Sequence, residues 1–182
     1  MFSRTAAGHL KELSRQFPSV TIVGPRQSGK TTLAQAVFPR HDYVSLEDPD
    51  VRRHAVEDPR GFFESHPAPL IIDEVQRVPD LLSYLQGIID RTKKNGQYVL
   101  TGSHQPRLKA EVSQSLAGRT ALLRLLPPSF AELKKAGVRQ SRDEWIWRGF
   151  MPRIYDQDMD ARFLYKSYFE TYVQRDLQQL IN

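Results

Sequence analysis

Short apolar runs alternate with amphipathic stretches along residues 1–126. The apolar runs predict strands, because each is a brief β-prone stretch bounded by glycine, proline or acidic residues. These strands are expected at residues 20–23, 43–46, 70–72, 98–101 and 121–126. The amphipathic stretches predict helices at residues 5–17, 30–38, 51–58, 80–92 and 105–116. Alternation of strands and helices favours right-handed crossovers, so residues 1–126 are predicted to form one α/β domain around a mostly parallel sheet.

The composition changes after residue 126, where two prolines end the last predicted strand. Residues 127–182 show helical patterns at 129–135, 144–148 and 161–181 and no strand pattern. The last helix is expected to place apolar side chains on one broad side, namely Phe163, Leu164, Tyr168, Tyr172, Val173, Leu177 and Leu180. That side either packs on the α/β core or meets a further part of the protein. We therefore predict that residues 127–182 form a helical lid or linker that leads into a second, C-terminal domain.

Composition narrows the class of protein without identifying it. Of 182 residues, 40% are hydrophobic and 26% are charged, which is the balance of an ordinary globular chain. The absence of cysteine excludes disulfides, cysteine-ligated metal sites and thiol catalysis. The net charge of +5, with arginine in excess over lysine, is too small to indicate nucleic-acid binding and fits a solvated surface. The sequence carries no secretory signal and no apolar membrane span, so we expect a cytoplasmic protein with no membrane partner.

One motif lies at the end of the first predicted strand. Residues 24–31, GPRQSGKT, match the phosphate-loop pattern G-x-x-x-x-G-K-[ST] between a strand and a helix. Its glycines let the backbone wrap phosphates, Lys30 would reach the β- and γ-phosphates, and the Thr31 hydroxyl would bind Mg²⁺. The alternative, a glycine-rich turn with an exposed lysine, is disfavoured by this context. The predicted nucleotide-binding residues are Gly24, Pro25, Arg26, Gln27, Ser28, Gly29, Lys30, Thr31 and Thr32.

An acidic pair, Asp73 and Glu74, follows the third predicted strand. In open parallel sheets, ligands bind at the carboxyl ends of the strands, so both side chains would lie near the phosphate loop. Asp73 would hold Mg²⁺ through a water molecule, and Glu74 would activate the water that attacks the triphosphate. A solvated acidic pair is the alternative, and it becomes the weaker interpretation once a complete phosphate loop precedes it.

Two further positions complete the predicted catalytic set. Thr101 or Ser103, at the end of the fourth strand, would position the water if that strand lies between the loop strand and the acidic strand. Ser103 is slightly preferred, although it could equally cap the next helix. Arg119, in the turn before the fifth strand, could reach the γ-phosphate of a neighbouring copy, although a loop arginine paired with a carboxylate is the commoner arrangement. The predicted catalytic residues are thus Glu74, Lys30, Ser103 and Arg119.

The order of these motifs resembles a known family, the prokaryotic AAA+-type ATPases that carry a C-terminal domain of unknown function. The resemblance covers essentially the whole chain. It implies a three-layer P-loop NTPase sandwich with strand order 5-1-4-3-2, a Walker A motif at residues 24–31 and a Walker B motif at Asp73 and Glu74. It also implies that the protein continues well past Asn182. The segments that carry the resemblance are GPRQSGKTTL (24–33), LIIDEVQ (70–76), LTGS (100–103) and LAGR (116–119).

The leading hypothesis is an Mg²⁺-dependent ATPase that couples hydrolysis to movement of the helical part and of a C-terminal domain. A slow nucleotide-dependent switch that presents this domain to a partner is the second hypothesis, and a DNA-associated accessory ATPase is the third. Glu74 favours hydrolysis over binding alone. The absence of an Asn-Lys-x-Asp motif argues against a Ras-like GTPase and favours adenine. Expected partners are ATP and ADP, a second copy of the chain, and a protein or DNA target reached through the C-terminal part.

Overall fold

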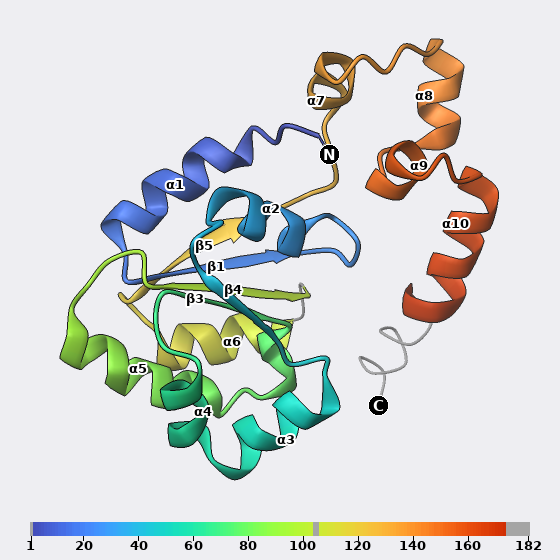
Figure 1. Ribbon diagram of the computed structural model, residues 1–182. Helices are drawn as coiled ribbons and strands as arrows, with labels where there is room; N and C mark the ends of the chain where they lie inside the picture. Colours follow the sequence, from blue (N-terminus) through green and yellow to red (C-terminus); the bar gives the residue numbers. More distant parts are fainter. Residues whose placement is uncertain (1, 104–105, 174–182) are drawn as a thin grey trace. The chain divides into compact units, whose positions relative to one another are not determined.

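The structure is a computed structural model that describes residues 2–103 and 106–173. The chain divides into two compact units. Arg4–Leu126 forms the α/β unit, and Pro127–Asn182 with Met1–Ser3 forms the helical unit. Figure 1 shows the path of the chain through its helices and strands. None of the described helices is long and apolar enough to cross a membrane.

Five parallel strands form the sheet at the centre of the α/β unit (Figure 1). Their order across the sheet is β2-β3-β4-β1-β5, which is the predicted order 5-1-4-3-2 read from the other edge. The predicted fold class is therefore confirmed, and each strand lies close to its predicted position. The strands are β1 (Ser19–Gly24), β2 (Asp42–Ser45), β3 (Leu70–Asp73), β4 (Tyr98–Ser103) and β5 (Thr120–Arg124).

Helices cover both faces of this sheet, which gives the three layers of the predicted sandwich (Figure 1). On one face, Leu10 of α1 and Leu33 of α2 belong to one buried cluster with residues of β1, β4 and β5. On the other face, Phe62 of α4 and Leu85 of α5 belong to a second cluster with residues of β3 and β4. The helices of this unit are α1 (Ala6–Gln16), α2 (Lys30–Val37), α3 (Pro49–Glu57), α4 (Pro59–Ser65), α5 (Leu81–Thr92) and α6 (Pro106–Ser115). The expected start of α6 at Gln105 lies outside the described residues.

The structure explains why β3 has an apolar residue at each position from Leu70 to Ile72, and not apolar and polar residues in alternation. Side chains along a strand point alternately to the two faces of a sheet. Ile71 accordingly joins the cluster under α1 and α2, whereas Leu70 and Ile72 join the cluster on the other face. All three are essentially inaccessible to solvent. A strand that is covered on both faces needs an apolar residue at every position.

Two aspartates set the starts of α3 and α4. The Asp48 carboxylate accepts hydrogen bonds from the N–H groups of Asp50 and Val51, and a proline follows it at the first helical position. Asp58 accepts from the N–H group of Gly61 in the same way. The helix predicted at residues 51–58 is thus α3, and α4 was not predicted from the sequence. Pro59 is the first residue of α4.

The helical unit consists of short helices. Its elements are α7 (Phe130–Lys135), α8 (Arg142–Arg148), α9 (Pro152–Asp156), α10 (Ala161–Tyr168) and the π-helical turn η2 (Phe169–Val173). Reciprocal capping boxes, Ser129 with Glu132 and Ser141 with Glu144, begin α7 and α8. The single helix predicted at residues 161–181 is correct only as far as Tyr168, where the π-turn replaces it. Residues 174–181 lie outside the described part of the chain, including the expected apolar positions Leu177 and Leu180.

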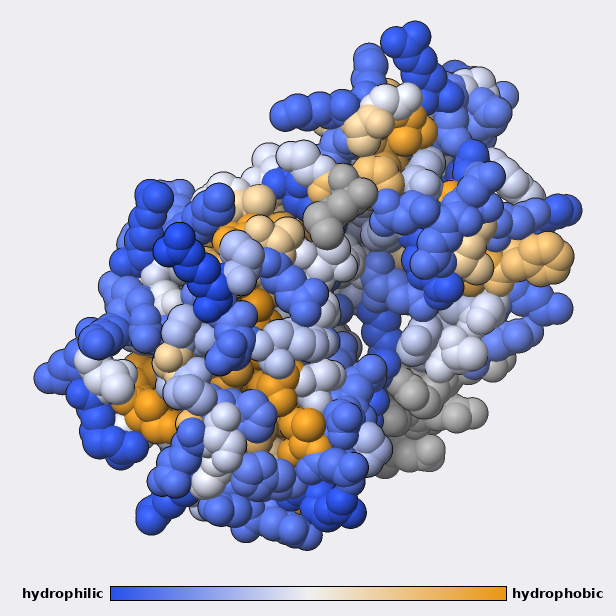
Figure 2. Space-filling model, in the orientation of Figure 1, coloured by the Kyte–Doolittle hydropathy of each residue, from blue (hydrophilic) through white to orange (hydrophobic). Residues whose placement is uncertain are grey.

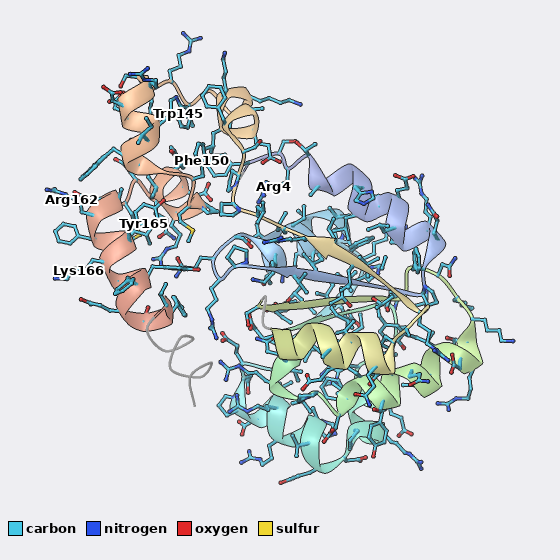
Figure 3. All side chains as sticks on the ribbon, turned by 180° about the vertical axis from the view of Figure 1, so that it is seen from behind. Arg4, Trp145, Phe150, Arg162, Tyr165 and Lys166 are labelled. Carbon is cyan, nitrogen blue, oxygen red and sulfur yellow. The ribbon has the colours of Figure 1, made fainter. Side chains whose placement is uncertain are left out.

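Aromatic side chains pack inside the helical unit. The rings of Trp145 and Phe150 are stacked with centroids 5.8 Å apart, and both residues are labelled in Figure 3. On α10, Leu164 is 3% exposed but Phe163 is 69% exposed, so the predicted apolar side does not include Phe163. Figure 2 shows apolar side chains at the surface of this unit among hydrophilic ones. Among the described residues of this unit, the large apolar ones that are more than half exposed are Ile146, Trp147, Phe163 and Phe169.

The buried clusters predict which truncation destabilises the chain. Leu85→Ala on α5 should lower the free energy of unfolding by about 3 kcal/mol, because it removes buried methyl groups and leaves a cavity. Val56→Ala on α3 is the control, since that side chain is 60% exposed and should change stability by less than about 0.5 kcal/mol. Urea unfolding followed by circular dichroism measures both. Equal losses would contradict the assigned core.

Candidate functional site

The carboxyl ends of three neighbouring strands meet at one edge of the sheet. β1 lies beside β4, and β4 lies beside β3. In this register Gly24 at the end of β1 is paired with Ser103 at the end of β4, and β3 ends nearby at Asp73. This arrangement brings the loop after β1, the acidic pair after β3 and the polar end of β4 together, as expected for the ligand edge of a parallel sheet.

Glycines shape the loop between β1 and α2. A Cβ atom on Gly24 would lie 2.0 Å from the carbonyl oxygen of Leu125, so no larger residue fits there without moving the chain. Gly29 precedes the first helical residue with φ of 89°, a conformation that favours glycine. Gln27 also has a positive φ, of 61°. The loop thus curls back on itself and leads into the N-terminus of α2, where free N–H groups favour an anion.

Lys30 is held inside this loop. Its ammonium group donates to the carbonyl oxygens of Gly24, at 3.2 Å, and Pro25, at 3.0 Å. The side chain is buried, and this burial lowers the pKa of Lys30 below its ordinary value, while the charges of Glu74 and Asp73 oppose that shift. The lysine is therefore a buried cation close to two carboxylates, and an anion bound in the loop would stabilise its charged form.

The Asp73 carboxylate is the centre of a hydroxyl network. Its Oδ1 atom accepts hydrogen bonds from Thr31 Oγ1, at 2.9 Å, and from Thr101 Oγ1. Its Oδ2 atom accepts from the Tyr43 hydroxyl at 3.0 Å. Burial, and then the nearby charge of Asp73, raise the pKa of Tyr43 to about 12. Tyr43 was not among the site residues predicted from the sequence, where its only signal was its place at the start of a predicted strand.

Glu74 follows Asp73 in a left-handed conformation, with φ of 56°. Its N–H group donates to Thr101 Oγ1 at 3.4 Å, and its carboxylate accepts from the side-chain amide of Gln76. The charge of Glu74 opposes the lowering of the Lys30 pKa by burial, which places the two groups within electrostatic reach of each other. The structure therefore brings Lys30, Thr31, Asp73 and Glu74 together.

Two buried hydroxyls near this network are unpartnered. Within the described residues, Ser28 Oγ and Ser103 Oγ are buried and make no hydrogen bond. Burying a polar group without a partner is unfavourable, so such groups indicate a place where a ligand or water binds. Thr101, by contrast, is engaged with Asp73. Of the two candidates on β4, Ser103 keeps a free hydroxyl and Thr101 does not.

Arg4 reaches the loop from the segment before α1. Its Nη1 atom donates to the Ser28 carbonyl oxygen at 3.0 Å, and its Nη2 atom donates to the carbonyl oxygen of Leu126 at 2.5 Å. Figure 3 labels Arg4 on this segment. The guanidinium group thereby fixes the back of the loop to the chain that follows β5. Sequence analysis missed Arg4, because no motif surrounds it.

Other predicted site residues lie apart from this group. The Thr32 side chain is exposed on α2, while those of Pro25, Arg26 and Gln27 are half-buried in the loop. Arg119 directly precedes β5. It therefore lies at the amino ends of the strands, whereas the loop lies at their carboxyl ends.

Arg119 is paired with a carboxylate, as in the alternative considered from its sequence. Its Nε and Nη2 atoms donate to the two carboxylate oxygens of Asp90, at 2.6 Å and 2.9 Å. This hydrogen bonding holds the pKa of Asp90 below its ordinary value. Within one copy, Arg119 therefore takes no part in the loop site, and its role toward the γ-phosphate of another copy stays a prediction.

Comparison with known proteins identifies relatives and similar folds. The uncharacterized proteins Rv2008c of Mycobacterium tuberculosis and Mb2031c of Mycobacterium bovis are each 33% identical over 97% of this chain. The chain spans 40% of the length of each of these relatives.

Solved structures of low sequence identity share the fold. The Walker-type ATPase PabY2304 of Pyrococcus abyssi has a TM-score of 0.58 at 15% identity, covering 99% of this chain and 75% of its own. AMPPCP-bound DnaA from Aquifex aeolicus has a TM-score of 0.56 at 17% identity, covering 94% of this chain and 63% of its own. The sequence model of the family described as AAA domain matches residues 16–134. The chain therefore belongs to the AAA domain family, in agreement with the resemblance found in its sequence motifs.

Proposed function

We propose that the chain binds ATP with Mg²⁺ in the loop of residues 24–32 and hydrolyses the bond between the β- and γ-phosphates. One observation carries this proposal: the Thr31 hydroxyl donates to Asp73 at 2.9 Å, although the two residues are 42 positions apart. That contact joins the helix after the phosphate loop to the acidic end of β3, which is the arrangement that metal-assisted phosphoryl transfer requires. The similar DnaA structure is bound to AMPPCP, which supports an adenosine triphosphate as the ligand.

The loop supplies the groups that bind phosphates. The N–H groups at the start of α2 provide positive potential, and the buried Ser28 hydroxyl has no partner among the described residues. Lys30 donates to two loop carbonyls and can exchange these bonds for stronger, charge-assisted bonds to phosphate oxygens. Phosphate binding would also satisfy the buried ammonium charge, whose deprotonation burial otherwise favours.

Thr31 and Asp73 would hold the Mg²⁺ ion. Both offer the oxygen donors that Mg²⁺ prefers, and the hydrogen bond between them already places these donors side by side. Among the described residues no group of three or more histidine, aspartate and glutamate side chains is placed to hold a metal ion. The remaining ligands would therefore be phosphate oxygens and water. When bound, the ion neutralises charge that develops on the phosphates.

Glu74 is the proposed general base. As the oxygen of a water molecule bonds to the γ-phosphorus, the bond from that phosphorus to the bridging oxygen breaks, ADP leaves, and Glu74 takes the proton of the water. Ser103 offers a buried, unpartnered hydroxyl as a donor to the transferred group. Arg119 would act only in an assembly, on the nucleotide of a neighbouring copy. Movement of the helical unit and of a C-terminal domain with the nucleotide state belongs to this proposal as well.

Removal of the Lys30 ammonium tests the phosphate-binding role. Lys30→Ala should weaken ATP binding at least about tenfold, because it removes charge-assisted hydrogen bonds to the phosphates. Isothermal titration calorimetry measures the affinity. Lys11→Ala, which changes an exposed lysine on α1, is the matched control and should bind as the wild type does. Equal affinity of the Lys30 variant and the wild type would remove Lys30 from the site.

Substitution of the proposed base separates binding from turnover. Glu74→Gln should bind ATP within about twofold of the wild type and lower kcat about 100- to 10,000-fold, because the amide cannot accept the proton of the water. A phosphate-release assay measures turnover, and Glu64→Gln on α4 is the exposed control. If the wild type binds ATP tightly without turnover, the slow switch described from the sequence replaces the enzyme. If Glu74→Gln turns over normally, Glu74 is not the base.

The proposed role of Thr31 as a ligand of Mg²⁺ can be tested separately from phosphate binding and turnover. Thr31→Val keeps the shape of the side chain and removes the hydroxyl that lies against Asp73. ATP affinity in EDTA should be unchanged, whereas the gain in affinity on adding Mg²⁺ should fall about tenfold. Thr92→Val on α5 is the control, because its hydroxyl donates to helix carbonyls of α5. An unchanged Mg²⁺ gain in the Thr31 variant would exclude Thr31 as a ligand.

A further inference from the structure

A short turn after the acidic pair holds a side-chain amide against Glu74. The turn η1 (Val75–Arg77) begins directly after Glu74 and packs against β4. Val75 and Val78 are buried on either side of it, and the N–H group of Arg77 donates to the Glu74 carbonyl oxygen at 3.0 Å. These contacts hold the turn in place, so the backbone of the turn sets where Gln76 lies relative to Glu74.

Gln76 forms a hydrogen bond through only one end of its side-chain amide. Its amide nitrogen donates to Glu74 Oε2. Within the described residues its amide oxygen is buried and has no partner. Only the nitrogen of an amide can donate to a carboxylate, so the contact with Glu74 also fixes which end of the amide is left open. An unpartnered acceptor thus lies beside the carboxylate of the proposed base.

A water molecule that attacks phosphorus has two O–H groups to place. The general base accepts one of them, and the other must be held by a second acceptor if the lone pair of the oxygen is to face the phosphorus. Glu74 offers the first acceptor. Of the hydroxyls at this end of the sheet, those of Thr31 and Thr101 donate to Asp73 and that of Ser103 can donate, whereas the amide oxygen of Gln76 can only accept.

We infer that Gln76 is a further catalytic residue, which orients Glu74 through its amide nitrogen and the attacking water through its amide oxygen. This inference rests on the proposed ATP hydrolysis. In the step itself the water oxygen bonds to the γ-phosphorus, one hydrogen passes to Glu74 as a proton, and ADP leaves with the bridging oxygen. The second hydrogen stays on the oxygen, bonded to Gln76, and leaves with the phosphate.

Near-isosteric substitutions test Gln76. Gln76→Met can neither donate nor accept in this way, and Gln76→Glu, when ionised, cannot donate to Glu74. Both variants should lower kcat about 10- to 100-fold, because Gln76→Met loses the orientation of the water and of Glu74, and Gln76→Glu loses the orientation of Glu74. ATP affinity and the midpoint of thermal unfolding should stay close to those of the wild type, since the side-chain hydrogen bond of Gln76 goes to Glu74 and not to the loop.

A second glutamine provides a matched control. The amide nitrogen of Gln97 also donates to an oxygen two residues before it, the Asn95 carbonyl at 3.2 Å, but Gln97 directly precedes β4, at the end of that strand opposite the loop. Gln97→Met should therefore leave kcat unchanged. The experiment measures kcat and KM by phosphate release, ATP affinity by calorimetry and unfolding by circular dichroism in the wild type, Gln76→Met, Gln76→Glu, Gln97→Met and Glu74→Gln.

The possible results separate the two claims. A loss of kcat in both Gln76 variants, with affinity and unfolding unchanged, supports the inference. If Glu74→Gln is inactive but both Gln76 variants keep kcat within twofold of the wild type, the inference fails and the proposed hydrolysis stands. A parallel loss of kcat, affinity and thermal stability in the Gln76 variants shows a structural role and overturns the inference. If the wild type does not hydrolyse ATP, the proposed function and the inference fail together.

Discussion

A single buried carboxylate organises the ligand edge of this sheet. Asp73 accepts hydroxyl donors from α2, from the edge strand β2 and from the central strand β4. A buried charge is stable only when such donors surround it, so these three elements are held at fixed positions around the end of β3. The loop after β1 and the acidic pair then take their places from the sheet register. Most of the site geometry follows from this one group and the parallel order of the strands.

Much of this architecture could be predicted from local sequence patterns. The strands are short apolar runs between breakers. The loop has glycine where its backbone approaches Leu125, at Gly24, and where the chain turns left-handed directly before α2, at Gly29. Strand order is different, because it depends on packing between distant segments. The hydrophobic pattern of the sequence does not determine the strand order, which was predicted here from the resemblance to a family.

Side-chain partners were the least predictable part of the site. Tyr43 and Arg4 reach the acidic pair and the loop from segments without a motif, and only the folded chain brings them there. Gln76 ends the segment LIIDEVQ, but nothing in that segment indicates that its amide donates to Glu74. Thr101 and Ser103 are both small, polar and two positions apart on β4, so the sequence could not assign their roles. In the structure Thr101 is bonded to Asp73, and Ser103 keeps its hydroxyl free.

The close approach of the loop to the end of β5 has a mechanical consequence. Gly24 lies so near the Leu125 carbonyl that not even a methyl group would fit between them, and Arg4 spans the carbonyls of Ser28 and Leu126. The next residue after Leu126 is the first of the helical unit in this part of the chain. Any displacement of Ser28 must therefore drag Arg4, strain its bond to Leu126 or break it. The last residue of the α/β unit is thus tethered to the phosphate-binding loop itself.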